Sequence, residues 1–441
     1  MMTSTLPALE RPWATAVRSN SELLLQIQRA MPGPCHLIHP STFAHNYRAF
    51  QQELSRRQVQ GKVYYGKKAN KASAWLREIA LLEGAVDVAS VPEFVHALAN
   101  GVRGDMIGVT GAAKSDELIW LAAQHGATLA IDALDELERA ITLTRKTAPL
   151  RILLRVQPEN SVSRFGFNSE DLKAALHRCH QVRKHIIMDG FSFHLDGYAV
   201  EPRAQLALRL LEQVKQAREA GFPCSSISIG GGFACCYVSE EDWARFNAEL
   251  HPGQFHAEKK FERFYPYFQG PTGASMLGAI LDSTQGAGSL AEALRQADVA
   301  LYLEPGRALL DGAGLSLFPV QGYKRIAEYG MVTVAGLSMS LSEQWKNSEF
   351  LPDPVLVQMG DSRPQVPVMA AIGGASCMEY DVLTWRKIRF PTQPRYGDLI
   401  AYPNTAGYQM DKNESEFHQL ALPPKLVITE ENGKLIWRRD Q

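Results

Sequence analysis

Several residues that could carry out chemistry follow short apolar runs in this sequence. The pair Lys67-Lys68 follows one run, His194 ends another, glycines 230–232 follow a third and Glu304 follows the last. A lysine amine can attack a carbonyl compound, and consecutive glycines let backbone N–H groups approach a phosphate closely. These residues can act together only if the fold brings them to one place.

The runs belong to a repeated pattern in which β-type segments alternate with amphipathic helical segments. Eight such parallel βα units are typical of a TIM barrel, although doubly wound sheets alternate in the same way. The number of units favours the barrel, and the active site would then lie where the strands end. The expected strands are 62–66, 85–88, 106–109, 128–131, 151–156, 188–194, 226–229 and 301–303.

The rest of the chain has a different pattern. After residue 312, short β runs are separated by turn residues, which predicts an all-β domain of sandwich or barrel type. The stretch 236–300 is too long for a simple connection and should contain helices of its own. We therefore expect an α/β fold with three parts: an N-terminal segment 1–38 packed on the β domain, a (β/α)8 TIM barrel 39–312, and a C-terminal β domain 313–441.

Composition restricts the possible partners. The net charge is −1, with 46 basic and 47 acidic residues, and nothing in this balance points to nucleic acid or an anionic membrane surface, since both need a concentrated basic footprint. No apolar run is long enough to form a signal peptide or a membrane span. The six scattered cysteines fit free thiols rather than a disulfide framework. We expect a cytoplasmic protein that handles small molecules and binds no metal.

Seven segments together resemble the alanine-racemase-like enzymes that use pyridoxal 5'-phosphate (PLP), in particular the ornithine, arginine and diaminopimelate decarboxylases. Each segment alone is a weak signal, but their shared order over nearly the whole chain is strong. They are Tyr-Gly-Lys-Lys-Ala-Asn at 65–70, Asp-Val-Ala-Ser-Val-Pro-Glu at 87–93, His194, Gly-Gly-Gly-Phe at 230–233, Glu-Pro-Gly-Arg at 304–307, Cys-Met-Glu-Tyr-Asp at 377–381 and Ala-Gly-Tyr at 406–408.

The resemblance implies that Lys68 holds PLP as a Schiff base. Lys67 competes for this role, but strand alternation points the two side chains to opposite faces, and the family lysine directly precedes Ala-Asn. We expect burial beside other cations to lower the pKa of Lys68. The other residues implied to bind the cofactor are Asp87, Arg155, His194, Gly230, Gly231, Gly232, Glu304, Gly306, Arg307 and Tyr408.

Glu304 bears on the reaction type. A carboxylate at the pyridine nitrogen keeps that nitrogen protonated and makes the ring a full electron sink, as a decarboxylase requires. Racemases of this superfamily place an arginine there. The sequence therefore predicts amino-acid decarboxylation, and the alternatives are a racemase or epimerase and a non-catalytic homologue that acts by binding a protein.

The resemblance also implies a homodimer with shared active sites. Cys377 would reach the partner's barrel and return a proton to the substrate carbon after CO2 leaves, since a thiol keeps its proton at neutral pH. Glu379 and Asp381 in the same segment are possible contacts for an amino-acid-like substrate.

Three departures separate the chain from this pattern. The family serine that helps to hold the phosphate, in His-x-Gly-Ser, is replaced by Gly197. Met378 stands where diamine-forming members often carry an acidic residue. The Arg-Pro-Ala-Leu-Tyr segment of diaminopimelate decarboxylases has no counterpart around 338–350. The substrate is therefore not clearly ornithine or diaminopimelate.

Overall fold

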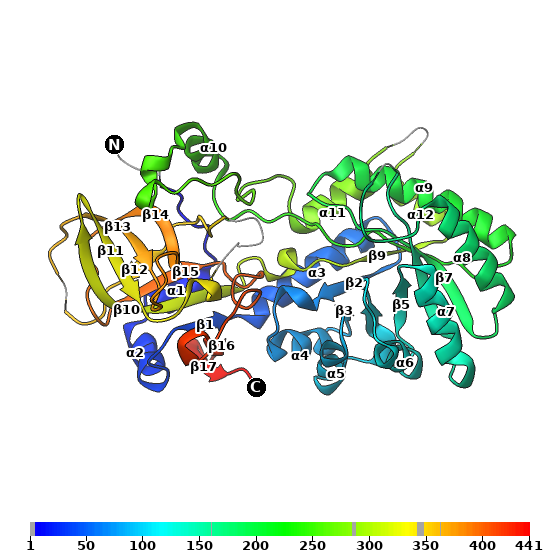
Figure 1. The fold of residues 1–441 in the computed structure, drawn as a ribbon, viewed down its shortest axis with the longest axis horizontal. Coiled ribbons are helices and arrows are strands. Elements are labelled where there is room, and N and C mark those ends of the chain that lie inside the picture. Colours follow the sequence, from blue (N-terminus) through cyan, green and yellow to red (C-terminus); the bar gives the residue numbers. More distant parts are fainter. Residues whose placement is uncertain (1–4, 160, 285–287, 342–347, 362) are drawn as a thin grey trace.

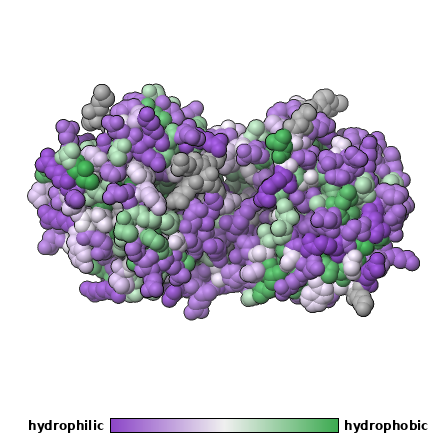
Figure 2. All heavy atoms as spheres, viewed as in Figure 1, coloured by the Kyte–Doolittle hydropathy of each residue, from purple (hydrophilic) through white to green (hydrophobic). Residues whose placement is uncertain are grey.

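The computed structural model describes residues 5–159, 161–284, 288–341, 348–361 and 363–441. Figure 1 shows two parts side by side, a helix-covered barrel and a sheet-rich domain. Polar side chains cover much of the face of both parts seen in Figure 2. No helix among the described ranges has both the length and the apolar character needed to cross a membrane.

The barrel is closed by eight parallel strands, each paired with its neighbours in chain order. All eight predicted strands are present, with ends that differ from the prediction by at most two residues. The predicted TIM barrel is therefore confirmed. Its strands are β2 (Gly61–Gly66), β3 (Ala85–Val88), β4 (Ile107–Val109), β5 (Thr128–Ile131), β6 (Leu150–Arg155), β7 (Ile186–Ser192), β8 (Ser226–Ser228) and β9 (Ala300–Leu303).

Helices cover the barrel, and their sequences explain where they begin and end. In α6 the Ser115 hydroxyl accepts a hydrogen bond from the N–H of Leu118, and Gly126 ends the helix at φ +68°. In α9 an apolar stripe that includes Leu206 and Leu210 is buried. The helices are α3 (Pro40–Arg56), α4 (Ser73–Leu81), α5 (Val91–Ala99), α6 (Asp116–His125), α7 (Leu134–Leu143), α8 (Ser169–Gln181), α9 (Val200–Glu219), α11 (Gly273–Asp282) and α12 (Leu290–Ala297).

The connection between β8 and β9 contains helices of its own, as predicted. Its first helix, α10 (Glu240–Glu249), lies beside the sheet domain rather than the barrel (Figure 1). A β-bridge between Phe255 and Arg386 joins this connection to the sheet domain. The chain then returns to the barrel through α11 and α12.

The second domain is built on a nine-stranded sheet that includes one strand from the start of the chain. Strand β1 pairs antiparallel with β10 and parallel with β16. Helices α1 (Pro12–Arg18) and α2 (Ser21–Ala30) bury Trp13, Val17 and Leu24 in a cluster with residues of the sheet. The strands are β1 (Cys35–Ile38), β10 (Gly314–Ile326), β11 (Tyr329–Val334), β12 (Val355–Val357), β13 (Val368–Gly373), β14 (Val382–Phe390), β15 (Leu399–Pro403), β16 (Lys425–Glu431) and β17 (Lys434–Arg439).

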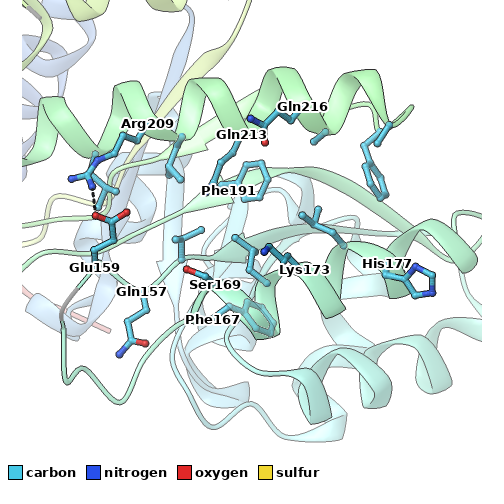
Figure 3. A pocket seen from close by; sticks show the side chains of 18 of the residues that line it. Gln157, Glu159, Phe167, Ser169, Lys173, His177, Phe191, Arg209, Gln213 and Gln216 are labelled. Carbon is cyan, nitrogen blue, oxygen red and sulfur yellow. Dashed lines mark hydrogen bonds and ion pairs between the residues drawn. The ribbon is translucent and has the colours of Figure 1, made fainter.

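A cavity of about 820 Å³ lies between helices α8 and α9 (Figure 3). Its lining includes the rings of Phe167 and Phe191, and an ion pair of 2.9 Å joins Glu159 and Arg209 at one end. None of the predicted site residues lines it. The predicted chemistry belongs to a different place in the fold.

Candidate active site

Most of the predicted site residues meet where the barrel strands end. Two adjoining cavities, each of about 350 Å³, share Lys68, His194 and Glu304 in their linings. The first is also lined by Asp87, Arg155, Arg164 and Phe165, and the second by Gly231, Gly232, Arg263, Gly306, Arg307 and Tyr408. Residues from strands far apart in sequence thus surround one cleft, with Lys68 between its two halves.

Lys68 lies in a 3-10 turn (Lys67–Ala69) that directly follows β2. Lys68 is exposed to the cleft, whereas Lys67 is only 3% exposed and lines neither cavity. The two lysines therefore point to different sides of the turn. Lys68 is the one placed to react with a molecule in the cleft.

The expected fall in the pKa of Lys68 is wrong in direction. Burial by itself would lower the pKa of Lys68, but Asp87, Tyr408 and Glu304 together outweigh burial and Arg155, and they raise it. The effect of these three groups on the ammonium group thus exceeds the effects that lower its pKa. Sequence order alone did not reveal this balance.

Asp87 is almost completely buried, at 4% exposure. The Thr110 hydroxyl donates to its Oδ1 atom at 2.7 Å. Burial and the nearby charge of Glu304 raise the pKa of Asp87 to about 7, while Lys68 opposes that rise. Asp87 can therefore hold or release a proton near neutral pH.

Glu304 is held by a serine that sequence reasoning missed. The Ser228 hydroxyl donates to Glu304 Oε1 at 2.8 Å, and the N–H of Gly230 donates to the same hydroxyl oxygen at 3.3 Å. Ser228 is 1% exposed and so links the carboxylate rigidly to the glycine loop. Its position, two residues before the glycines, was a signal that could have identified it, because alternate strand residues face the same side.

His194 borders both halves of the cleft and carries no proton on Nδ1. The N–H of Gly231 donates to Nδ1 at 3.2 Å, which leaves the ring proton on Nε2. Enclosure at the barrel mouth, followed by the charges of Lys68 and Arg155, lowers the pKa of His194 to about 3. The imidazole is therefore a neutral ring at physiological pH.

The glycine loop leaves no room for side chains. A Cβ built on Gly231 would lie 2.7 Å from the Glu304 carbonyl oxygen, and one on Gly230 would lie 2.7 Å from His194 Nδ1. Gly230 and Gly232 also have φ values of +66° and +81°, which favour glycine. The sequence thus gives a close-fitting backbone cradle beside the cleft.

The turn after β9 packs against the turn that carries Tyr408. The N–H of Tyr408 donates to the Ala69 carbonyl at 2.8 Å, and a Cβ on Gly306 would lie 2.9 Å from the Tyr408 hydroxyl. The Arg307 guanidinium stacks on the Tyr408 ring at 4.9 Å and on the Tyr265 ring at 4.2 Å. The side chain of Arg307 therefore orders the tyrosine, a contact that sequence reasoning did not foresee.

Arg155 lies at the end of β6 and lines the first cavity. Its guanidinium pairs with Asp132 at 3.3 Å and stacks on the Phe165 ring at 4.5 Å. In the same cavity the buried Oγ of Ser192 has no hydrogen-bond partner within the described part of the chain. The site thus offers a fixed cation and a free hydroxyl to a bound molecule.

The residues of segment 377–381 are not brought into this cleft. Cys377 and Glu379 are exposed in the turn between β13 and β14, and neither lines the two cavities. Both carboxylate oxygens of Asp381 accept backbone hydrogen bonds, from the N–H groups of Ser338 (2.7 Å) and Ser376 (3.0 Å). Part of the stretch 338–350, residues 342–347, lies outside the described residues.

This arrangement fits PLP. The glycine cradle and the Tyr408 hydroxyl suit a phosphate, Glu304 suits a protonated ring nitrogen, and Lys68 suits an aldehyde. The described residues include no cluster of three or more His, Cys, Asp or Glu side chains that could bind a metal.

Comparisons with known proteins identify the family. The pyridoxal-binding domain of the pyridoxal-dependent decarboxylases matches residues 41–262. An uncharacterised protein, y4yA of Sinorhizobium fredii, is 35% identical, with 96% of this chain and 94% of that protein covered. A diaminopimelate decarboxylase of Actinosynnema pretiosum is 26% identical, with coverages of 98% and 94%.

The fold is also that of a solved structure, the diaminopimelate decarboxylase of Helicobacter pylori complexed with L-lysine. The TM-score is 0.73 at 16% identity, with 95% of this chain and 97% of that chain covered. The chain therefore belongs to the pyridoxal-dependent decarboxylase family and is a PLP-dependent amino-acid decarboxylase.

Proposed function

We propose that this enzyme removes the α-carboxyl group of an amino acid or an amino-acid-derived compound, with Lys68 as the residue that holds PLP covalently. The observation that carries the proposal is the position of Lys68, His194 and Glu304, which line both halves of one cleft. PLP, when bound, supplies an electron sink for the electron pair that CO2 leaves behind.

Different residues of this chain would bind, orient and shield the cofactor. Glu304, oriented by Ser228, would hold a proton at the ring nitrogen. The neutral His194 ring would cover one face of the cofactor and exclude water from it. Asp87 and Arg155 would adjust the charge around Lys68. The glycine cradle and Tyr408 would bind the phosphate, which fixes the cofactor's orientation.

We also propose a homodimer in which each cleft is completed by Cys377 of the partner subunit, which returns a proton to the substrate carbon. The support is that Cys377 is exposed in its own chain and lines neither cavity there. Tyr380, three residues further on, is 67% exposed, which suits a residue that becomes covered by another subunit.

The proposed substrate has the amino and carboxyl groups of an amino acid. The identity of its distal group is a separate question. Several relatives are named as diaminopimelate decarboxylases. However, this chain lacks the Arg-Pro-Ala-Leu-Tyr segment, so we propose a different distal group.

The six free cysteines support action in the reducing cytoplasm.

A substrate panel tests the activity. Purified enzyme with PLP is given diaminopimelate, lysine, ornithine, arginine and other D- and L-amino acids, and CO2 release is measured. We expect release from at least one compound other than ornithine and diaminopimelate. Epimer formation without CO2 would instead establish the racemase alternative, and no reaction with any compound would favour a non-catalytic role.

Two variants test the shared site. Lys68→Ala should bind PLP without covalent attachment, and Cys377→Ala should attach PLP but turn over slowly or give a different product. When the two impaired variants are dissociated, mixed and reassociated, about a quarter of wild-type activity should return, because half of the dimers are then mixed and each mixed dimer has one intact site. No recovery would contradict a cleft shared between subunits.

A further inference from the structure

Arg203 is a fully buried arginine in the first turn of α9. Its relative exposure is 0%. Nη1 donates to the carbonyl of Ala199 at 2.8 Å, and Nη2 donates to the carbonyls of Leu195 (3.2 Å) and Gly197 (2.6 Å). Nε is buried and has no hydrogen-bond partner within the described ranges. The guanidinium is therefore held in place by neutral backbone groups.

Among the described residues, no carboxylate lies close enough to form an ion pair with this buried charge. Arg203 forms no ion pair within 4 Å in the described part of the chain. Asp196 and Tyr198 influence it from the loop that precedes α9, but Asp196 is exposed, where water weakens its effect. A buried cation without a partner is costly unless another anion is bound nearby. The charge of Arg203 is therefore available to an anion that binds nearby from outside the chain.

The guanidinium lies directly behind the half of the cleft that Gly231 and Gly232 line, where the proposed phosphate site is. A Cβ built on Gly232 would clash with Arg203 Nη2 and would lie 3.0 Å from the Gly197 carbonyl oxygen. Gly197, Gly231 and Gly232 all line the cavity of about 350 Å³ in this half. Arg203 does not line it. One layer of glycine backbone separates the charge from the cavity.

We propose that Arg203 is a positioning residue for the cofactor phosphate: it supplies a positive charge through the Gly197 and Gly232 backbone and takes over the role of the serine that the family pattern places at position 197. The inference rests on the proposed site of the phosphate at Gly230–Gly232. It goes beyond that proposal because it assigns a residue behind the cradle, on a helix, to phosphate binding.

The dominant alternative is that Arg203 only fastens the loop 195–199 through its three hydrogen bonds. The two roles differ in what they do to the phosphate itself. A counter-charge stabilises the dianion of the phosphate, whose second pKa is ordinarily about 6. A fastener changes the loop but has no preference for a doubly charged ligand.

The test compares apoenzyme affinities for PLP and for pyridoxal, which lacks the phosphate. The full-length protein carries Arg203→Met, Arg203→Lys or no substitution. We expect Arg203→Met to weaken PLP binding roughly tenfold or more, as for the loss of an interaction with a charged group, while pyridoxal binding changes little. Arg203→Lys, which keeps the charge, should restore most of the preference for PLP.

Phosphorus NMR of bound PLP provides the second readout. In the wild type the phosphate should stay a dianion below pH 6, and in Arg203→Met its titration should move upward by about one pH unit or more. Arg218→Met is the matched control, because Arg218 lies on the same helix and donates to the carbonyls of Cys224, Ala297 and Asp298, outside both halves of the cleft. It should leave both readouts unchanged.

Two results would overturn the inference. If Arg203→Met keeps the wild-type preference for PLP and the wild-type titration, or if Arg203→Lys is as impaired as Arg203→Met, the arginine only fastens the loop. A wild-type protein that does not prefer PLP to pyridoxal would refute the proposed phosphate site as well. The outcomes for the two proposals are thus distinguishable.

Discussion

The charges around Lys68 determine the pH at which its amine loses its proton and can react. Asp87 and Glu304 stabilise the ammonium form, and this effect exceeds the opposing effects of burial and Arg155. An amine must lose its proton before it attacks an aldehyde. Asp87 and Glu304 suit the cleft to a protonated pyridine ring. Because they also raise the pKa of Lys68, they raise the pH at which the cofactor attaches most readily.

Asp87→Asn should shift the pH dependence of cofactor attachment to lower pH. Removal of this negative charge lowers the pKa of Lys68, so the free amine appears at lower pH, by about one unit. The rate at which apoenzyme attaches PLP, followed by absorbance across a pH series, measures the shift.

Thr110→Val is the graded control for that measurement. Without the Thr110 hydrogen bond the pKa of Asp87 rises further, but Asp87 stays ionised at the high pH at which Lys68 loses its proton, so the midpoint should move much less than in Asp87→Asn. An unchanged midpoint in Asp87→Asn would show that Asp87 does not govern Lys68.

The reactive groups lie at the ends of secondary-structure elements, and these elements fix their positions. The barrel strands deliver Lys68 and Glu304 to the cleft, and the turn between β13 and β14 presents Cys377. The carboxylate of Asp381 organises this turn, since it accepts hydrogen bonds from Ser338 and Ser376 and is 4% exposed. Its sequence-based interpretation as a possible substrate contact remains a prediction, but its bonds show a structural role.

Asp381→Ala should destabilise the protein and slow turnover without weakening PLP binding. One buried and one partly buried N–H group lose their acceptor, at a cost of up to about 1–3 kcal/mol each, and Cys377 loses its fixed position. Thermal unfolding, kcat and the PLP dissociation constant measure the three effects. Glu379→Ala, in the same turn but exposed, should leave stability unchanged. A loss of PLP affinity in Asp381→Ala would argue that the turn supports the chain's own cleft.

At the scale of the whole molecule, the first strand joins the N-terminus to the β domain and contains a buried histidine. His36, at 1% exposure, shares a hydrogen bond of 2.8 Å with Ser316 on β10, whose hydroxyl also contacts Thr405 at 2.7 Å. Burial, with help from Lys425, lowers the pKa of His36 from 6.5 to about 3. His36 is therefore neutral in the folded protein over most of the acid range.

This shift predicts acid sensitivity between pH 6.5 and about 3. In that window the unfolded chain binds a proton at His36 that the folded protein does not, so the free energy of unfolding falls as pH falls, by up to a few kcal/mol, and this contribution is constant above pH 6.5. Urea unfolding at several pH values should show a flatter dependence for His36→Asn. The exposed His177→Asn should keep the wild-type slope, and an equal slope in His36→Asn would refute the assignment.

The sequence by itself determined the barrel and most of the cleft. Each βα unit is local, so apolar runs, Ser115 and Gly126 mark its strands and helix ends without reference to distant parts of the chain. Because parallel strands of a barrel end at one rim, the residues after those runs, Lys68 and Glu304 among them, could be placed together before the fold was known.

Only the tertiary structure decided the order of strands in the β domain, the sign of the Lys68 pKa shift and the roles of Ser228 and Arg203. Strand β1 pairs with strands roughly 280 and 390 residues away, which no local pattern encodes. Arg203 does lie three residues before Leu206, on the buried stripe of α9, and that spacing was its signal. What a buried charge faces, however, depends on side chains brought together from separate strands, and electrostatic effects follow distance in space rather than order in the chain.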